Sequence, residues 1–376
     1  MNRLKKKRLF ACSTEYTIFN ALNLELNKSN KNKKKTDIAI FTRSKKITKI
    51  SKLISKSNIF DKIYQFYFIN NMNFFFLTLI ILLPKLAINF FLRKNGSCVM
   101  KSNVYDEIIS QSLLYAIIFR KFNKDAKIYL IDEGISAYTG RTASNRKRSK
   151  NFLFFNKYIL KVDLKNLISS YYLYKPSMYR GDHIKITPLP QLKRDNYKIY
   201  DKIFSFNNCN NYNLSPFIYL GAAFFGIRDL LTNPNKASPN FENKCRLILD
   251  KLFSSLTRSS FLYRKHPLEE VNLENNNQNF KFDLSENIWE LECQNKIDNN
   301  HVIVSFFSTG SFSPKILYDK EPYVIFLYKL LDEDFLNADN VVLNFKSTYK
   351  KPEKVIVPES LEHLSDTLKN LEYNKF

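Results

Sequence analysis

The stretch KIYLIDEGISAYTGR, Lys127–Arg141, decides the fold class of this chain. Its apolar run, Ile128–Ile131, leads into two adjacent acids, Asp132 and Glu133, and then into Gly134. A short apolar run that ends at a glycine turn is typical of a buried strand in a parallel sheet. Ligands of open α/β sheets bind beyond the carboxyl ends of such strands. The stretch therefore predicts an α/β fold with two acids at a ligand-binding edge, although a helix cap or a closed turn would use the same residues.

Predicted strands and helices alternate on both sides of this stretch. Short apolar runs predict strands at 8–12, 36–42, 63–69, 183–187, 217–220, 260–264, 301–305 and 323–327. Helical spacing of apolar residues predicts helices over 15–27, 44–57, 106–119, 240–256, 285–295 and 357–373. Alternation of this kind is typical of parallel sheets with helices on both faces.

A change in composition near the middle of the chain predicts two domains. Pro188, Pro190 and the Asn-rich segment 207–215 break the pattern of strands and helices. The expected parts are a Rossmann-like domain at 1–195 that carries the DEG motif, a linker at 196–215, a second Rossmann-like domain at 216–350, and a C-terminal helix at 351–376 that packs back towards the N-terminal domain.

The positive charge is concentrated in the N-terminal part of the chain. The 376 residues include 59 Lys and Arg against 35 Asp and Glu, a net charge of +24. Residues 1–150 hold 30 basic and 9 acidic residues, a net charge of +21, and residues 151–376 add only +3. Such a basic half predicts an anionic partner, either a membrane surface or an anionic glycan, with compositional drift as the alternative. Nucleic acid is disfavoured, because no RRM, KH or OB signature accompanies the basic and aromatic residues.

Cysteine and histidine usage argues against two classes of site. The five cysteines are scattered and form no CxxC motif, which predicts a reducing compartment and no disulfide framework. The four histidines show no metal-ligand spacing such as HExxH, so we expect no metal site.

Residues 74–92 are the candidate membrane segment. They span 19 residues, close to the length that crosses a bilayer, but Pro84 and Lys85 interrupt them. This pattern favours an interfacial or buried pair of short helices over a true span. The N-terminus predicts no signal peptide, because Ser13, Thr14 and Glu15 break its apolar part.

Three short motifs share one kind of position, just beyond a predicted strand. They are DEG at 132–134, KHP at 265–267 and STG at 308–310. Two parallel sheets that face each other would bring these strand ends to one central cleft. That arrangement is called GT-B, and we expect this fold for the chain.

The motifs, in this order and strand context, resemble those of bacterial sialyltransferases of glycosyltransferase family 52, which act on lipooligosaccharide and capsule. The resemblance runs from LFACSTEY at 9–16 to YVIFLY at 323–328. It implies an inverting, metal-independent transfer of sialic acid from CMP-N-acetylneuraminate to a terminal sugar, such as galactose, of a surface glycolipid or polysaccharide. It also implies no cofactor and leaves a homodimer open. Together with the basic N-terminal half, it predicts a peripheral, cytoplasmic location at an anionic membrane.

Two other functions stay open at this point. The same fold could use another sugar nucleotide, or the chain could be a non-catalytic protein that binds membrane or glycan. Ala222 is one reason, because the family often has Gln after the glycine of that strand end. The cytidine contacts that this Gln would indicate are therefore not predicted here.

The resemblance assigns roles to the residues of these motifs. Asp132 would be the general base, with Glu133 as the supporting or substitute acid, and His266 would donate a proton or hydrogen bond to the departing CMP phosphate. Ser136 and Tyr138 could contact either substrate. The candidate donor-binding residues are Gly134, Lys265, Pro267, Ser308, Thr309, Gly221 and Glu290. Ser308 and Thr309 would hold phosphate, Glu290 the ribose, and Gly221 would let the nucleotide approach. The structural alternatives are an N-cap for the hydroxyls and a buried structural histidine.

Overall fold

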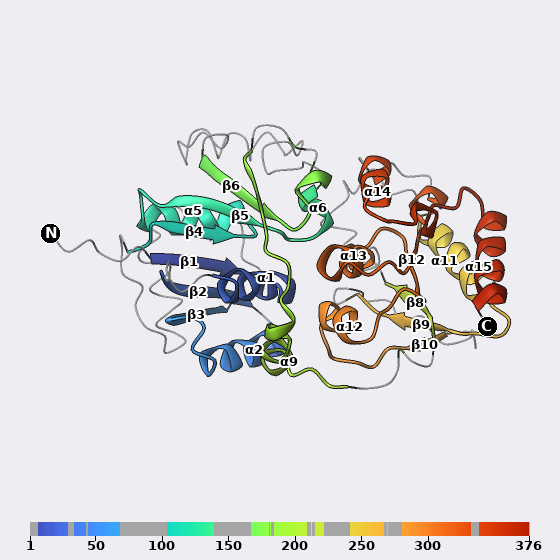
Figure 1. The fold of residues 1–376 in the computed structure, drawn as a ribbon, viewed down its shortest axis with the longest axis horizontal. Coiled ribbons are helices and arrows are strands. Elements are labelled where there is room, and N and C mark those ends of the chain that lie inside the picture. Colours follow the sequence, from blue (N-terminus) through green and yellow to red (C-terminus); the bar gives the residue numbers. More distant parts are fainter. Residues whose placement is uncertain are drawn as a thin grey trace. The chain divides into compact units, whose positions relative to one another are not determined.

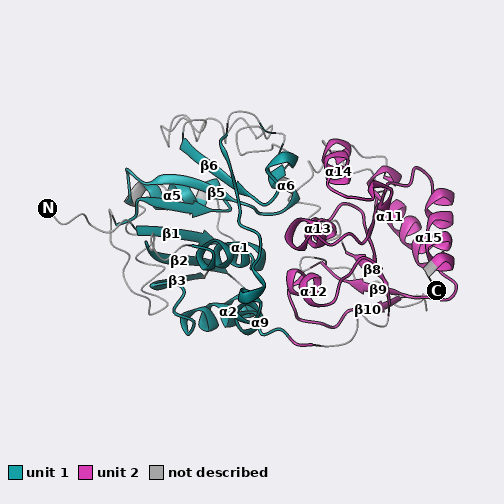
Figure 2. Cartoon of the chain, in the orientation of Figure 1, with its two compact units in different colours: residues 1–206 teal, residues 207–376 magenta. Residues whose placement is uncertain are grey.

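The chain divides into two compact units, residues 1–206 and 207–376 (Figure 2). Each unit contains a parallel sheet, of seven strands in unit 1 and six strands in unit 2. The computed structural model describes residues 7–28, 34–42, 44–67, 104–138, 167–179, 181, 184–208, 212, 215–221, 241–266, 269, 280–331 and 338–375. The predicted α/β class with two parallel sheets is confirmed.

The sheet of unit 1 has the strand order β3-β2-β1-β4-β5-β6-β7, and every pair is parallel (Figure 1). Its strands are β1 (Lys7–Cys12), β2 (Lys35–Thr42), β3 (Lys62–Tyr67), β4 (Glu107–Ser110), β5 (Lys127–Ile131), β6 (Ile168–Leu173) and β7 (Ile186–Pro188). The order reverses between β1 and β4, so the crevice of this sheet lies beyond the carboxyl ends of these two strands.

The strands of this sheet are buried on both sides because helices cover both of its faces. The described helices are α1 (Glu15–Leu26), α2 (Lys45–Ser55), α5 (Leu113–Phe122), α6 (Ile135–Tyr138) and α9 (Tyr197–Ile203). Leu9 of β1 faces the apolar side of α5. Phe10 points to the opposite face, where its ring contacts Phe60, and there Phe19 of α1 packs on Tyr200 of α9.

The sheet of unit 2 has the order β10-β9-β8-β11-β12-β13, again with every pair parallel. Its strands are β8 (Phe217–Leu220), β9 (Phe261–Arg264), β10 (Phe280–Phe282), β11 (Val302–Ser305), β12 (Tyr323–Phe326) and β13 (Val355–Ile356). The helices are α11 (Phe241–Ser254), α12 (Trp289–Asn295), α13 (Ser313–Tyr318), α14 (Ala338–Lys346) and α15 (Leu361–Lys375). This order is that of a Rossmann-type sheet, with its reversal between β8 and β11.

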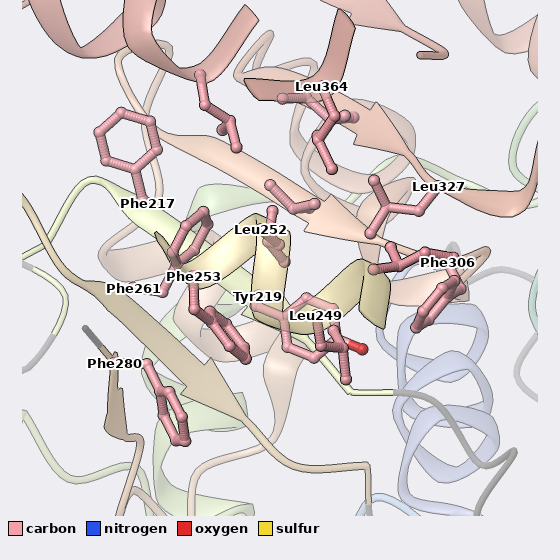
Figure 3. Close-up of a cluster of buried hydrophobic side chains, with 14 of the residues drawn as sticks. Phe217, Tyr219, Leu249, Leu252, Phe253, Phe261, Phe280, Phe306, Leu327 and Leu364 are labelled. Atoms are coloured by element: carbon pink, nitrogen blue, oxygen red, sulfur yellow. The ribbon is translucent and has the colours of Figure 1, made fainter. Parts of the chain in front are cut away.

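Alternating residues of β8 build the two cores of unit 2. Phe217 and Tyr219 point into an aromatic cluster under α11 and α15, which Figure 3 shows. Ile218 and Leu220 point to the other face, against Trp289 of α12. The strand is therefore apolar throughout, as expected for a parallel strand covered on both faces.

The structure corrects one predicted helix and leaves two expectations untested. The segment 106–119 is not one helix, because β4 occupies Glu107–Ser110 and α5 begins only at Leu113. Ile108 and Ile109 are buried in the sheet between β1 and β5, and a short apolar run of this kind fits a strand or a helix equally well. None of the described helices has the length and apolarity that crossing a bilayer requires, and residues 74–92 lie outside the described part. Leu364 of α15 packs into the core of unit 2, and packing of this helix towards the N-terminal domain stays a prediction.

Candidate active site

The loops after β1 and β4 are tied together beside the strand-order reversal of unit 1. Gln111 accepts a hydrogen bond from the backbone N of Ser13 (2.8 Å) and donates one to its hydroxyl (2.6 Å). Thr14 caps α1, and its hydroxyl accepts from the backbone N of Thr17, whose hydroxyl accepts in return from the backbone N of Thr14. This reciprocal capping box fixes the first turn of α1, and that turn carries Tyr16.

Asp132, which directly follows β5, is buried with an exposed fraction of 0%. Its Oδ1 accepts hydrogen bonds from the backbone N of Gly134 (2.8 Å) and from the hydroxyl of Tyr16 (3.3 Å), and its Oδ2 accepts one from the hydroxyl of Tyr138. Burial raises the pKa of Asp132 to about 6, although these hydrogen bonds oppose the rise. A carboxyl group with a pKa near neutrality suits proton transfer at physiological pH.

The turn after β5 separates the two adjacent acids. Gly134 has a φ of 114°, a conformation that other residues rarely adopt, and the turn lets its amide N–H point back to the Asp132 carboxylate. The backbone carbonyl of Asp132 is held by the side chain of Asn20 on α1 (2.9 Å). Glu133, the next residue, is exposed. The sequence leaves the partner of Tyr138 open, and the structure shows this residue to be buried against Asp132.

In unit 2, Gly221 and His266 meet at the carboxyl ends of β8 and β9. The backbone N of Gly221 donates to the carbonyl of Arg264 (2.8 Å), and a Cβ at Gly221 would lie 2.9 Å from the backbone N of His266. That backbone N donates to Glu269 (3.0 Å), whose other carboxylate oxygen accepts from the hydroxyl of Tyr263. Burial lowers the pKa of His266, which favours the neutral imidazole, and a neutral imidazole can donate one N–H hydrogen bond.

The segment after β11 lies against the end of β8. Ser308 caps the single 3₁₀ turn η7 (Thr309–Ser311), with its hydroxyl accepting from the backbone N of Gly310 (3.3 Å). The carbonyl of Gly310 accepts from the indole N–H of Trp289 (2.7 Å), and a Cβ at Gly310 would lie 2.8 Å from Leu220. The structure thus brings Gly221, His266 and Ser308–Gly310 to one edge of this sheet. The N-cap that the sequence allows for Ser308 is present.

The remaining candidates differ in their surroundings. Arg264, the last residue of β9, donates a hydrogen bond to the Asp283 carboxylate (2.6 Å). Lys265 is exposed, with its ammonium group 4.7 Å from the centre of the Phe282 ring. Glu290 is buried on α12. Pro267 and the side chain of Ser136 lie outside the described part of the chain.

Two residues that the sequence did not single out contact the predicted ones. Tyr16 reaches Asp132 from 116 positions earlier, and no local pattern connects two residues so far apart. Glu269 follows His266 by three residues and binds its backbone, which a loop sequence does not reveal. Within the described ranges, no group of three or more Cys, His, Asp or Glu side chains could hold a metal ion, and independence of metal stays a prediction.

Comparison with known proteins identifies the fold class. No family model and no curated protein matches the sequence. A putative UDP-N-acetylglucosamine 2-epimerase from Listeria monocytogenes has a similar structure, with a TM-score of 0.51 and 10% identity over 99% of this chain and 89% of that one. LpCGTa in complex with UDP gives a TM-score of 0.50 and 13% identity, over 98% and 90%. The glycotransferase of kitacinnamycin gives 0.47 and 10%, over 98% and 96%.

These similarities, together with the two parallel sheets, confirm the predicted GT-B fold. They extend along nearly the whole chain, so both units take part in the match. At identities this low they define the fold and not the reaction, because one fold carries many reactions. The function has to be argued from the residues at the two strand-end edges.

Proposed function

We propose that the chain is an inverting, metal-independent sialyltransferase that moves sialic acid from CMP-N-acetylneuraminate to a terminal sugar of a bacterial surface glycan. The acceptor would be lipooligosaccharide or capsule, with galactose as the expected terminal sugar. The observation that carries the proposal is Asp132, a buried carboxyl group at the carboxyl edge of a GT-B sheet with its pKa raised to about 6. The resemblance of the three strand-end motifs supplies the donor and the acceptor class.

The reaction in this proposal is a single displacement. Asp132 takes the proton of the acceptor hydroxyl, the acceptor oxygen bonds to the anomeric carbon, and the bond to the CMP phosphate breaks on the opposite side. One displacement inverts the configuration at that carbon. Glu133, which is exposed, is the substitute base if Asp132 does not receive the proton.

Unit 2 would bind the donor. The neutral imidazole of His266 donates an N–H hydrogen bond to the departing phosphate, and such a bond strengthens as charge develops there. The hydroxyls of Ser308 and Thr309 add further donors, and the missing side chain of Gly221 lets the Glu269 carboxylate and the backbone of His266 pack against the end of β8 beside them. Glu290 would bind the ribose. The proposed donor-binding residues also include Lys265, for its positive charge. Pro267 and Gly134 belong to them because they shape the turns after their strands.

A membrane-associated acceptor fits the charge distribution. The net charge of +21 in residues 1–150 would hold unit 1 at an anionic surface by long-range attraction. The proposed location is therefore the cytoplasmic face of the cell membrane, with peripheral attachment and without nucleic acid as a partner. A homodimer is compatible with this location.

A second candidate function is a glycosyltransferase of the same fold with a UDP-sugar donor. The solved structure of LpCGTa in complex with UDP favours it, because that protein matches this chain over 98% of its length. A third candidate, a non-catalytic membrane or glycan binder, requires neither Asp132 nor His266. Nucleotide binding separates the three, since only the first predicts stabilisation by CMP.

The test combines a thermal-shift panel with a transfer assay. CMP should raise the melting temperature of the full chain and UDP should not, because a ligand stabilises only the folded state that binds it. With CMP-sialic acid and a galactose-terminated acceptor, Asp132→Ala and His266→Ala should each lower turnover by at least about 100-fold. Asp250→Ala and His363→Ala, which change exposed residues of the same types, are the matched controls. No transfer across an acceptor panel, or stabilisation by UDP alone, would contradict the proposal.

A further inference from the structure

We propose that the hydroxyl group of Tyr16 contacts the acceptor and relays its proton to Asp132, an inference that rests on the function proposed above. The reason is a geometric conflict at the carboxylate. Asp132 has no exposed surface, and a group without exposed surface does not touch a substrate. A general base needs hydrogen-bond contact with the proton that it removes, directly or through an intermediate group.

Among the described residues, four groups hydrogen-bond to the Asp132 carboxylate, and only one of them can form that link. Tyr174 donates through its backbone N–H, which cannot relay a proton. Gly134 is buried and donates through its backbone N–H, which has no second proton to pass on. Tyr138 is buried, with an exposed fraction of 1%, and holds Oδ2 from inside the protein. Tyr16 is partly exposed and reaches Oδ1 from the first turn of α1, which the capping box fixes in position.

The distance from the Tyr16 hydroxyl to Oδ1 fits a contact that tightens when substrate binds. It is 3.3 Å, whereas O–H···O bonds are commonly about 2.7 Å, and the Gly134 bond to the same oxygen is 2.8 Å. Catalytic hydrogen bonds are often long before substrate is present.

The proton transfer balances without another reactant. The acceptor proton passes to the phenol oxygen of Tyr16 as the Tyr16 proton passes to Oδ1 of Asp132. The acceptor oxygen forms its bond to the anomeric carbon while the bond from that carbon to the phosphate oxygen breaks, and the bonding electrons leave with CMP. Tyr16 ends neutral and Asp132 ends protonated, and the reverse relay returns this proton to solvent after the product leaves.

The experiment compares Tyr16→Phe with Tyr138→Phe in the full chain. Tyr16→Phe should lower kcat for transfer by about 100-fold or more while leaving the KM for CMP-sialic acid and the stabilisation by CMP unchanged. A proton inventory in mixtures of light and heavy water should be curved for the wild type, because two protons move, and linear for the residual activity of the variant. Tyr138→Phe should leave the curvature in place, because Tyr138 passes no proton.

Each outcome decides between the two proposals. If Tyr16→Phe retains kcat within about threefold, or if the wild-type inventory is linear, the relay is wrong and the sialyltransferase assignment stands. A rise in kcat would show that Tyr16 covers the carboxylate, which also overturns the relay. The inventory uses the wild-type protein, so a failure of the variant to fold does not affect the test. Absence of both CMP stabilisation and transfer in the wild type would overturn the proposed function and the relay together.

Discussion

Replacing Asp132 by Asn should change how the stability of the protein depends on pH. Burial raises the pKa of this carboxyl group from 3.8 to about 6, a shift of about two units. Because one unit corresponds to 1.36 kcal/mol, the difference amounts to about 3 kcal/mol. The native state holds the proton more tightly than the unfolded state, so this stabilisation is complete well below pH 3.8 and is lost as the pH rises through 6. Asn carries no titrating proton, and the variant should lack this loss.

The measurement is the urea unfolding free energy of the wild type and Asp132→Asn between pH 4 and 7.5. The difference between them should shift by about 2.5 kcal/mol in favour of the variant over this range, since all other titrating groups cancel. The single tryptophan, Trp289, lies in unit 2, so its fluorescence follows that unit while circular dichroism follows both. The shift should therefore appear in a transition that circular dichroism detects and fluorescence does not.

Glu133→Gln is the matched control for this experiment. It removes the adjacent acid, but that acid is exposed, so no charge buried in the protein is lost. We expect a difference from the wild type that stays constant with pH. The reasoning is refuted if Asp132→Asn also differs from the wild type by a constant amount from pH 4 to 7.5. Such a result would mean that Asp132 titrates at its ordinary pKa despite its burial.

Three further predictions concern the two strand-end edges. The transfer rate should rise with pH through about 6 as Asp132 ionises, and a flat profile would contradict its role as base. Gly221→Ala should weaken stabilisation by CMP and lower unfolding stability by about 1–3 kcal/mol, because its Cβ would collide with the Glu269 carboxylate and with the backbone N of His266; an unchanged urea midpoint would contradict these contacts. Asp283→Asn should cost about 3 kcal/mol by leaving the largely buried Arg264 without its ion-pair partner, measured by the same method, and a loss well under 1 kcal/mol would show that the pair is screened.

The sequence is most informative where a strand is buried on both faces. The run before Asp132 and the run HVIVS at 301–305 are short, apolar and followed by turn residues, and both are central strands of the structure. The same logic fails at 106–119, where the apolar residues fit a strand and a helix equally well. The identity of β4 depends on its neighbours β1 and β5, which pair with it on either side.

The candidate site was predictable in its location and not in its contacts. Alternation along a strand requires that one of the two acids points inward, but which chemistry follows depends on the groups that surround it. The hydroxyl of Tyr16 comes from a helix 116 positions earlier, so only the folded chain reveals it. The link between Gly221 and His266 likewise depends on the pairing of β8 with β9.

The burial of Asp132 is itself an argument for proton chemistry. The amide oxygen of Asn could accept from the N–H of Gly134 and the hydroxyl of Tyr16, and its NH2 group could donate to the Tyr138 oxygen if that hydrogen bond reversed its direction. Asn would avoid the loss of about 3 kcal/mol that an ionised, buried carboxylate brings at neutral pH. Proteins retain destabilising groups chiefly where function requires them. An acid in this position, beside the partly exposed residue Tyr16, agrees with the proton exchange proposed above.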